Sequence, residues 1–253
     1  MDIFQTIILS VVEGITEFLP ISSTGHLILV SNLLKIFQSE FVKSFEIIIQ
    51  LGAILSVVVI YFKKLITNFE LWKKIITAFL PSVVFGTLFY KLIKSYLIGN
   101  SLVVVWSLLI GGIVMIIFEK YHKNKEKTLS LKDYFLIGLF QVFSMIPGVS
   151  RAFATIFGGM VVGMKRKEAT EFSFLLAIPT MFGASVLDLV KTDLSVWTSS
   201  NLTLLIIGFI GSFMTAYITI KFLIKFVQTH DFVVFGWYRI IVAILFAFYI
   251  FRM

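Results

Sequence analysis

The chain has 253 residues, of which 58% are hydrophobic, only 14% are charged and none is cysteine. Soluble domains carry about 25% charged residues, so this composition excludes an ordinary soluble domain and indicates a membrane protein. The formal net charge of +8 does not indicate nucleic acid, because the basic residues stand in short loops between apolar runs, where they act as topology signals. Without cysteine there is no disulfide framework, thiolate metal site or cysteine nucleophile. The N-terminus lacks a basic region and a small-residue cleavage site, so we expect no removable signal peptide.

The first half of the chain predicts a broken helix pair followed by three membrane spans. The apolar stretches 3–20 and 27–37 are separated by Pro20 and Gly25, and neither exceeds the ~20 residues that a spanning helix needs. We therefore expect them to enter and leave the membrane on the same face. The three spans that follow are predicted over Phe45–Phe62, 75–92 and 101–118.

The second half predicts the same succession of elements. Residues 119–133 are the most polar segment and are expected to form a hinge between the halves. The short apolar stretches Tyr134–Ile146 and Ala152–Met164 then repeat the broken pair, with Pro147-Gly148 between them. Three further spans are predicted over 172–190, 202–222 and 232–251.

These elements predict an all-α integral membrane protein of one domain, built from two repeats over about 1–118 and 134–253. Pro20 and Ser23 have the same spacing as Pro147 and Ser150, which suggests how the repeats align. Because each half has an odd number of spans, the second repeat should lie inverted relative to the first. Each half would be a broken re-entrant helix pair plus three transmembrane helices.

The distribution of Lys and Arg predicts the orientation in the membrane. If the loop 63–74 is cytoplasmic, the loops on its side hold fourteen basic residues and the opposite side holds six. By the positive-inside rule, both termini should then lie outside. The first broken pair would enter from the outer face and the second from the inner face.

The densest group of reactive side chains is the stretch Glu13-Gly-Ile-Thr-Glu17-Phe-Leu-Pro-Ile-Ser-Ser23-Thr-Gly-His26. Glu13 and Glu17 share a helix face, so a cation or a shared proton must offset the cost of burying both. The two carboxylates could hold a divalent cation, Mg²⁺ or Ca²⁺, that bridges a diphosphate. For phosphoryl transfer, Ser23 or His26 could be the nucleophile and Glu17 the base or orienting group. The hydroxyls that flank Ser23 are expected to bind the substrate; they belong to Ser22 and Thr24.

In the second broken pair, Arg151 is the most conspicuous residue. An arginine at membrane depth costs roughly 2.5 to 3.5 kcal/mol and needs an anionic partner. Its guanidinium matches phosphate oxygens in a bidentate fork, and Gly148, Ser150 and Thr155 around it are expected to bind the same substrate. An ion pair between Arg151 and one of the two glutamates is the structural alternative. The two interpretations are compatible if a phosphate displaces or joins the pair.

Other polar residues in the apolar segments are less informative. Glu46 and Gln50 share a helix face and fit cavity lining and helix packing equally well. Asp188 and Arg239 lie in later spans and suggest a structural ion pair. The phenylalanines are expected to face lipid.

The first motif resembles the glutamate-rich motif of the bacterial undecaprenyl-diphosphate phosphatase family of the bacitracin-resistance type. The stretch from Pro147 to Thr155, Pro-Gly-Val-Ser-Arg-Ala-Phe-Ala-Thr, is similar to the second family motif, Pro-Gly-x-Ser-Arg-Ser-x-x-Thr. Residues 171–179 are similar to a further family segment. Ala152 stands where the family usually has serine, which shifts weight to the hydroxyls of Ser150 and Thr155.

The resemblance implies removal of the terminal phosphate from undecaprenyl diphosphate, giving the monophosphate that recycles the cell-wall lipid carrier, and tolerance to bacitracin. It also implies a divalent-cation requirement and a site open to the outer face of the bacterial inner (plasma) membrane. The expected partners are undecaprenyl diphosphate and the lipid bilayer, with no nucleic acid and with a homodimer left open. The implied catalytic set is Glu13, Glu17, Ser23, His26 and Arg151.

The main alternative is a carrier, because inverted repeats with broken helices also build secondary transporters. A polyprenyl-phosphate flippase would need the arginine and the cavity but not a nucleophile beside a carboxylate pair. A lipid phosphatase with a phosphohistidine intermediate is a weaker alternative. Its Ser-Arg-x5-His-x3-Asp element is missing, since the next histidine after Arg151 is His230.

Overall fold

The computed structural model describes the chain except for residues 90–99, 123–126, 192–195 and 253. The side chains of residues 187, 188, 191, 251 and 252 are also outside the description. The described residues form ten α-helices and one 3-10 turn. The elements are α1 (Ile3–Thr16), α2 (Ser23–Leu33), α3 (Glu40–Thr67), α4 (Phe69–Leu88), α6 (Ser101–Tyr121), α7 (Leu131–Val142), η2 (Phe143–Met145), α8 (Arg151–Val161), α9 (Arg166–Lys191), α10 (Ser199–Phe226) and α11 (Val233–Arg252).

Six of these helices are long and apolar enough to cross a membrane, namely α3, α4, α6, α9, α10 and α11. Each overlaps one of the predicted spans, so the six predictions are confirmed for the described residues, although α4 ends at Leu88 and α11 begins at Val233, one residue after the predicted start. Positions 90–92 of the second span and part of the 119–133 hinge lie outside the described residues. The helices α1, α2, α7 and α8 have only 14, 11, 12 and 11 residues. A hydrocarbon core about 30 Å thick needs about 20 helical residues, so none of the four can cross it alone. The protein is therefore a multi-pass membrane protein with four short helices among its spans.

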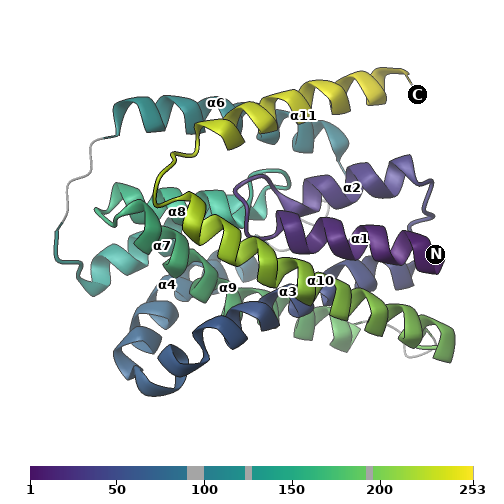
Figure 1. Cartoon of the computed structure of the whole chain (residues 1–253), viewed down its shortest axis with the longest axis horizontal. Helices are drawn as coiled ribbons and strands as arrows, with labels where there is room; N and C mark the ends of the chain where they lie inside the picture. Colours follow the sequence, from purple (N-terminus) through teal and green to yellow (C-terminus); the bar gives the residue numbers. More distant parts are fainter. Residues whose placement is uncertain (90–99, 123–126, 192–195, 253) are drawn as a thin grey trace.

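The long helices pack as neighbouring pairs around the short ones (Figure 1). The helix α10 lies along α3 and α1, α7 lies along α4, and α6 pairs with α11 at the top of the view. Glycine permits the closest of these approaches. A Cβ on Gly14 of α1 would lie 2.6 Å from the Ser212 carbonyl oxygen of α10, and one on Gly138 of α7 would overlap the backbone of Ala78 in α4.

Several phenylalanines lie in the interior, where the expectation that they face lipid is wrong. Phe18, Phe45 and Phe174 are fully buried. Phe18 follows the short helix α1 and meets Phe174 of α9 edge to face, with 5.1 Å between the ring centroids. Short helices leave interior volume that a large ring fills, and a ring pair of this geometry adds to the stabilisation from burial. Phe37 and Phe69, in contrast, are 85% and 81% exposed.

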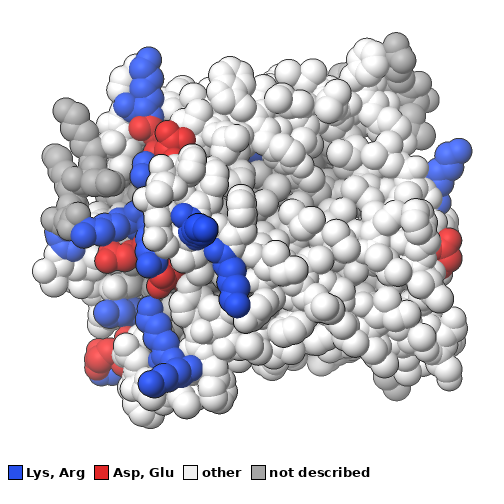
Figure 2. Space-filling view, viewed as in Figure 1, with Lys and Arg blue, Asp and Glu red and all other residues white. Residues whose placement is uncertain are grey.

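The charged side chains gather at one end of the molecule (Figure 2). Lys, Arg, Asp and Glu crowd the left end of the view, a broad belt nearly free of charged side chains follows it, and only a few charged residues lie at the right end. The turn between α3 and α4 lies at the crowded end, and both chain termini lie at the sparse end (Figure 1). A belt with so little charge between two polar ends is the surface that a bilayer requires.

Candidate active site

The helices α2 and α8 both begin after an unusual turn. Their N-cap residues, Ser22 and Ser150, have φ angles of 73° and 77°, a region that costs a non-glycine residue about 1–3 kcal/mol. Each serine hydroxyl accepts a hydrogen bond from the backbone N–H three residues later, at 3.4 Å from Gly25 and 3.2 Å from Phe153. The two helices therefore start in the same strained way although they belong to different halves of the chain.

Both helix starts border one cavity of about 150 Å³. The first motif contributes Glu17 and three of its four hydroxyl residues to the wall, the second motif contributes the segment around Arg151, and three further elements complete it. The lining residues are Glu17, Ser22, Ser23, Thr24, Gln50, Ser144, Pro147, Gly148, Ser150, Arg151, Thr180 and Met181. Because the N-terminal ends of two helices and a guanidinium meet there, the cavity favours an anion.

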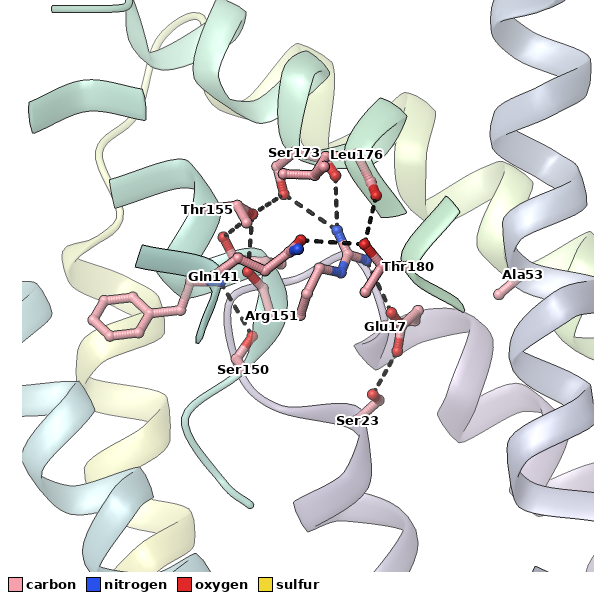
Figure 3. A network of polar contacts seen from close by, with 12 residues as sticks. Glu17, Ser23, Ala53, Gln141, Ser150, Arg151, Thr155, Ser173, Leu176 and Thr180 are labelled. Carbon is pink, nitrogen blue, oxygen red and sulfur yellow. Dashed lines mark hydrogen bonds and ion pairs between the residues drawn. The ribbon is translucent and has the colours of Figure 1, made fainter. Parts of the chain in front are cut away.

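A buried ion pair joins the two motifs across this cavity (Figure 3). Arg151 Nη2 lies 2.9 Å from Glu17 Oε1, and the two side chains are only 6% and 3% exposed. The other carboxylate oxygen of Glu17 accepts a hydrogen bond of 2.6 Å from the Ser23 hydroxyl. The ion pair expected between the arginine and a glutamate is thus present, and it leaves a serine hydroxyl bonded to a carboxylate beside a guanidinium.

Ser173 of α9 fixes the guanidinium of Arg151 by hydrogen bonds. Its Nη1 donates to the Ser173 carbonyl at 2.8 Å and to the Ser173 hydroxyl at 3.3 Å. The Thr155 hydroxyl donates to the Arg151 carbonyl at 2.8 Å and lies 2.6 Å from the Ser173 hydroxyl. A hydroxyl has only one hydrogen to donate, so in the second of these contacts Ser173 is the donor and Thr155 the acceptor. The Nε of Arg151 is buried without a hydrogen-bond partner, so one N–H of the guanidinium is left unsatisfied.

Thr155 and Ser173 therefore support the arginine instead of reaching the cavity. Thr155 is fully buried and does not line the cavity, unlike Gly148 and Ser150, which were also predicted to bind substrate and do line it. Ser173 was not predicted as a site residue. The available signal was its position within residues 171–179, the segment that resembles a further family motif.

Glu13 lies one helical turn before Glu17 and is completely buried. Neither of its carboxylate oxygens has a hydrogen-bond partner, and Glu13 does not line the cavity. Glu13 is therefore a buried carboxylate near the ion pair whose two oxygens accept no hydrogen bond. Burial of such a group is costly unless a proton or a cation joins it.

His26 is turned away from the ion pair toward α11. Its Nδ1 lies 2.8 Å from the Ser22 carbonyl oxygen, and its Nε2 lies 2.8 Å from the Tyr238 hydroxyl. Since a carbonyl only accepts, Nδ1 carries the hydrogen, and in the neutral ring Nε2 accepts from Tyr238. His26 is 6% exposed and does not line the cavity. Tyr238 was missed because nothing marks one tyrosine within a predicted span as a partner of a histidine 212 residues earlier.

The remaining polar residues have separate places. Gln50 lines the cavity, whereas Glu46 accepts a hydrogen bond of 2.9 Å from the Ser31 hydroxyl and does not line it. The side chain of Asp188 lies outside the described residues, so its expected pair with Arg239 stays a prediction. The donors of Arg239 are all directed at backbone carbonyl oxygens.

The fold and the site together define a class of protein: a multi-pass membrane protein with a hydroxyl-rich cavity at which a buried arginine and the N-terminal ends of two helices meet, an arrangement suited to a phosphorylated ligand. The comparison with known families is more specific. The chain belongs to the family described as bacitracin resistance protein BacA, whose sequence model matches residues 6–245.

Individual relatives agree over nearly the whole chain. A protein of Aquifex aeolicus is 52% identical over 252 residues, covering 98% of each chain. One of Sulfurihydrogenibium sp. is 49% identical, covering 97% of this chain and 98% of the relative, and one of Methanococcus aeolicus is 48% identical, covering 97% of each. All three are named undecaprenyl-diphosphatase. The family resemblance inferred from the two motifs is confirmed.

Proposed function

We propose that this protein hydrolyses undecaprenyl diphosphate to undecaprenyl phosphate and inorganic phosphate. The relatives named undecaprenyl-diphosphatase support this activity, and the family description links it to bacitracin resistance. The structural observation that carries the proposal is the contact series from the Ser23 hydroxyl through Glu17 to Arg151 at the wall of an anion-favouring cavity. The product is the lipid carrier of cell-wall synthesis, so the enzyme serves its recycling.

In the proposed mechanism the terminal phosphate lies between the starts of α2 and α8. The guanidinium of Arg151, which lines the cavity, and the N-terminal N–H groups of the two helices bind its oxygens and stabilise the charge that spreads over them in the transition state. The hydroxyls of Ser22 and Thr24 line the same wall. Ser150 caps its own helix there and fixes the direction of these donors.

Ser23 is the nucleophile that the geometry favours. Its hydroxyl is bonded to Glu17 at 2.6 Å, so Glu17 can take the proton as Ser23 Oγ attacks the terminal phosphorus and the bond to the bridging oxygen breaks. The prenyl phosphate leaves with that oxygen. Water then attacks the phosphoserine, the proton on Glu17 returns to Ser23 Oγ, and phosphate leaves with the hydrogens of the water. His26 is less suited to attack, because both of its ring nitrogens are engaged.

The expected divalent cation, Mg²⁺ or Ca²⁺, fits the two carboxylates. Among the described residues no group of three or more His, Cys, Asp or Glu side chains is placed to hold a metal. However, Glu13 offers two buried oxygens without partners beside Glu17, and such cations often take one or two carboxylates together with substrate phosphate oxygens. Glu13 and Glu17 would hold the ion, which would neutralise charge on the diphosphate.

The inverted-repeat architecture is part of the proposal. One support is the likeness of α2 and α8, which have 11 residues each and follow N-cap serines of nearly equal φ. The other is a pair of matching contacts between the halves: Gly14 lets α1 pack against α10, and Gly138 lets α7 pack against α4. The two repeats would span about 1–118 and 134–253. In this alignment the N-cap Ser22 corresponds to the N-cap Ser150. The alignment suggested by the sequence, which matched Ser23 to Ser150 by their distance from the prolines, is therefore off by one residue.

We further propose that the charge-rich end faces the cytoplasm of a bacterial inner membrane and that the site opens outward. The asymmetry of charge in Figure 2 and the position of both termini at the sparse end support this orientation. Because the chain has no cysteine, single cysteines can test it. Phe37 lies just before α3 and Phe69 just after it, at the start of α4, and both positions are highly exposed, so Phe37→Cys and Phe69→Cys mark the two ends of α3. An impermeant thiol reagent added to intact cells should label only Phe37→Cys; the reverse pattern would invert the orientation.

The activity itself is tested with purified protein in detergent. We expect it to release inorganic phosphate from undecaprenyl diphosphate and to lose this activity when a chelator removes divalent cations. A flippase would release no phosphate under these conditions. Absence of phosphate release from a folded preparation supplied with Mg²⁺ or Ca²⁺ would therefore overturn the proposed function.

A further inference from the structure

Arg239 of α11 is a completely buried cation that the proposed mechanism does not use. A guanidinium has five N–H donors, and all five of Arg239 meet backbone carbonyl oxygens. The acceptors and distances are Pro20 at 3.1 Å, Ser107 at 2.9 Å, Leu108 at 3.4 Å, Gly148 at 2.9 Å and Val149 at 2.9 Å. A buried arginine that satisfies backbone carbonyls from several segments connects those segments directly.

Three of these carbonyls belong to the two motif turns. Pro20 lies in the turn between α1 and α2, and Gly148 and Val149 lie in the turn before α8. The same Nη1 donates to Pro20 and to Val149, so the two turns meet at one nitrogen atom. The other two carbonyls belong to α6, against which α11 packs.

We propose that Arg239 is a positioning residue that holds the two motif turns in register, and this inference rests on the proposed active site. Within two residues after these carbonyls lie Ser22 and Ser150, the two non-glycine N-caps with positive φ among the described residues. Such conformations persist only where surrounding contacts impose them, and charge-assisted hydrogen bonds are strong enough to do so. Through these turns Arg239 determines how Ser23 is placed relative to Arg151.

The surroundings of Arg239 fit an arginine more closely than any other cation. The guanidinium lies over the ring of Phe153, 4.9 Å from its centroid. Gly111 of α6 leaves the space that the group occupies, because a Cβ at this position would overlap Nη2. A lysine keeps the charge but offers three donors from a single nitrogen, so it cannot serve carbonyls in five directions.

The test separates positioning from charge. Arg239→Lys retains the positive charge but loses the planar guanidinium that bonds several carbonyls at once. We expect its kcat to fall on the order of 100-fold, because a displacement of about 1 Å in a site costs this much, while its KM stays within a few-fold of the parent value. Gly111→Ala leaves Arg239 in place but pushes its guanidinium aside, so it should lower kcat in the same way. Gly183→Ala is the matched control, because its Cβ would meet only Phe79, at 3.9 Å, and it should keep the parent kcat.

The double variant makes the test specific. Once Arg239→Lys has removed the guanidinium, the methyl of Gly111→Ala has nothing to displace, so the double variant should lose no more activity than Arg239→Lys alone. Parent kcat in Arg239→Lys, or in Gly111→Ala, would overturn the inference, and so would fully multiplicative losses in the double variant. Thermal unfolding in detergent identifies any variant that fails to fold; if Arg239→Lys fails, the kcat of Gly111→Ala alone decides. If Arg151→Ala remains active, the proposed site is wrong whatever Arg239 does.

Discussion

The substitution Arg151→Met separates the stability of the site from its chemistry. Arg151 and Glu17 are 6% and 3% exposed, so loss of the guanidinium strands a carboxylate inside the protein. Breaking a buried ion pair on one side typically costs about 3–5 kcal/mol of stability. The same substitution removes the charge that meets the phosphate, and comparable arginines contribute about 10³–10⁵-fold in rate. We therefore expect kcat to fall at least 10³-fold, equivalent to about 4 kcal/mol of transition-state stabilisation.

A double variant tells the two effects apart. In Glu17→Gln/Arg151→Met no uncompensated charge of this pair remains, so part of the lost stability should return while activity stays absent. Arg166→Met is the matched control: it breaks the pair between Arg166 and Glu119, where Nη2 and Oε2 are 2.6 Å apart, away from the cavity lining. It should lower stability and leave kcat close to the parent value.

The assays are thermal unfolding of purified protein in detergent and phosphate release from undecaprenyl diphosphate. Activity of Arg151→Met within tenfold of the parent would refute the role given to the guanidinium. A double variant less stable than Arg151→Met alone would refute the stability argument, because the stranded carboxylate would then not be the source of the cost.

Three further predictions concern the same reaction. Glu17→Gln should lower kcat by about 10²–10⁴-fold in phosphate release, the usual contribution of a general base, and near-parent kcat would exclude that role. Ser23→Ala should abolish the phosphoenzyme expected after brief incubation with substrate labelled in its terminal phosphate; if it retains most of its turnover, the nucleophile is His26 or an activated water. Ala152→Ser should leave kcat within about threefold in the same assay, because this position does not line the cavity; a large change would assign the side chain a role that the structure does not show.

Much of the architecture could be predicted because membrane burial leaves a strong signal. A run of apolar residues long enough to cross the bilayer is rare in soluble domains, and each of the six predicted spans falls largely within a long helix. The same cost of burying charge made Arg151 and the glutamates conspicuous. A buried positive charge needs a buried negative charge beside it, so an ion pair between Arg151 and one of the glutamates could be predicted, and the pair with Glu17 is present.

Contacts that depend on three-dimensional packing could not be predicted in this way. Tyr238 and Arg239 are adjacent residues of a predicted span. Tyr238 was not singled out, and Arg239 was expected only to pair with Asp188, yet Tyr238 bonds His26 and Arg239 bonds both motif turns. A hydroxyl–imidazole contact or a bond to a carbonyl leaves no spacing pattern, because its partner is fixed only by the packing of α11. The same holds for Ser173 of α9, whose role depends on the packing that brings its carbonyl to Arg151 of α8.

The central claim is that the two motifs bind one phosphate group together. The most direct test is the ³¹P NMR signal of a prenyl methylenebisphosphonate, a diphosphate analogue that cannot be hydrolysed at the bridge, titrated with purified protein in detergent. The signal should shift or broaden with the parent protein and with Arg166→Met, and it should stay unchanged with folded Arg151→Met. Equal binding by Arg151→Met and the parent would contradict the account.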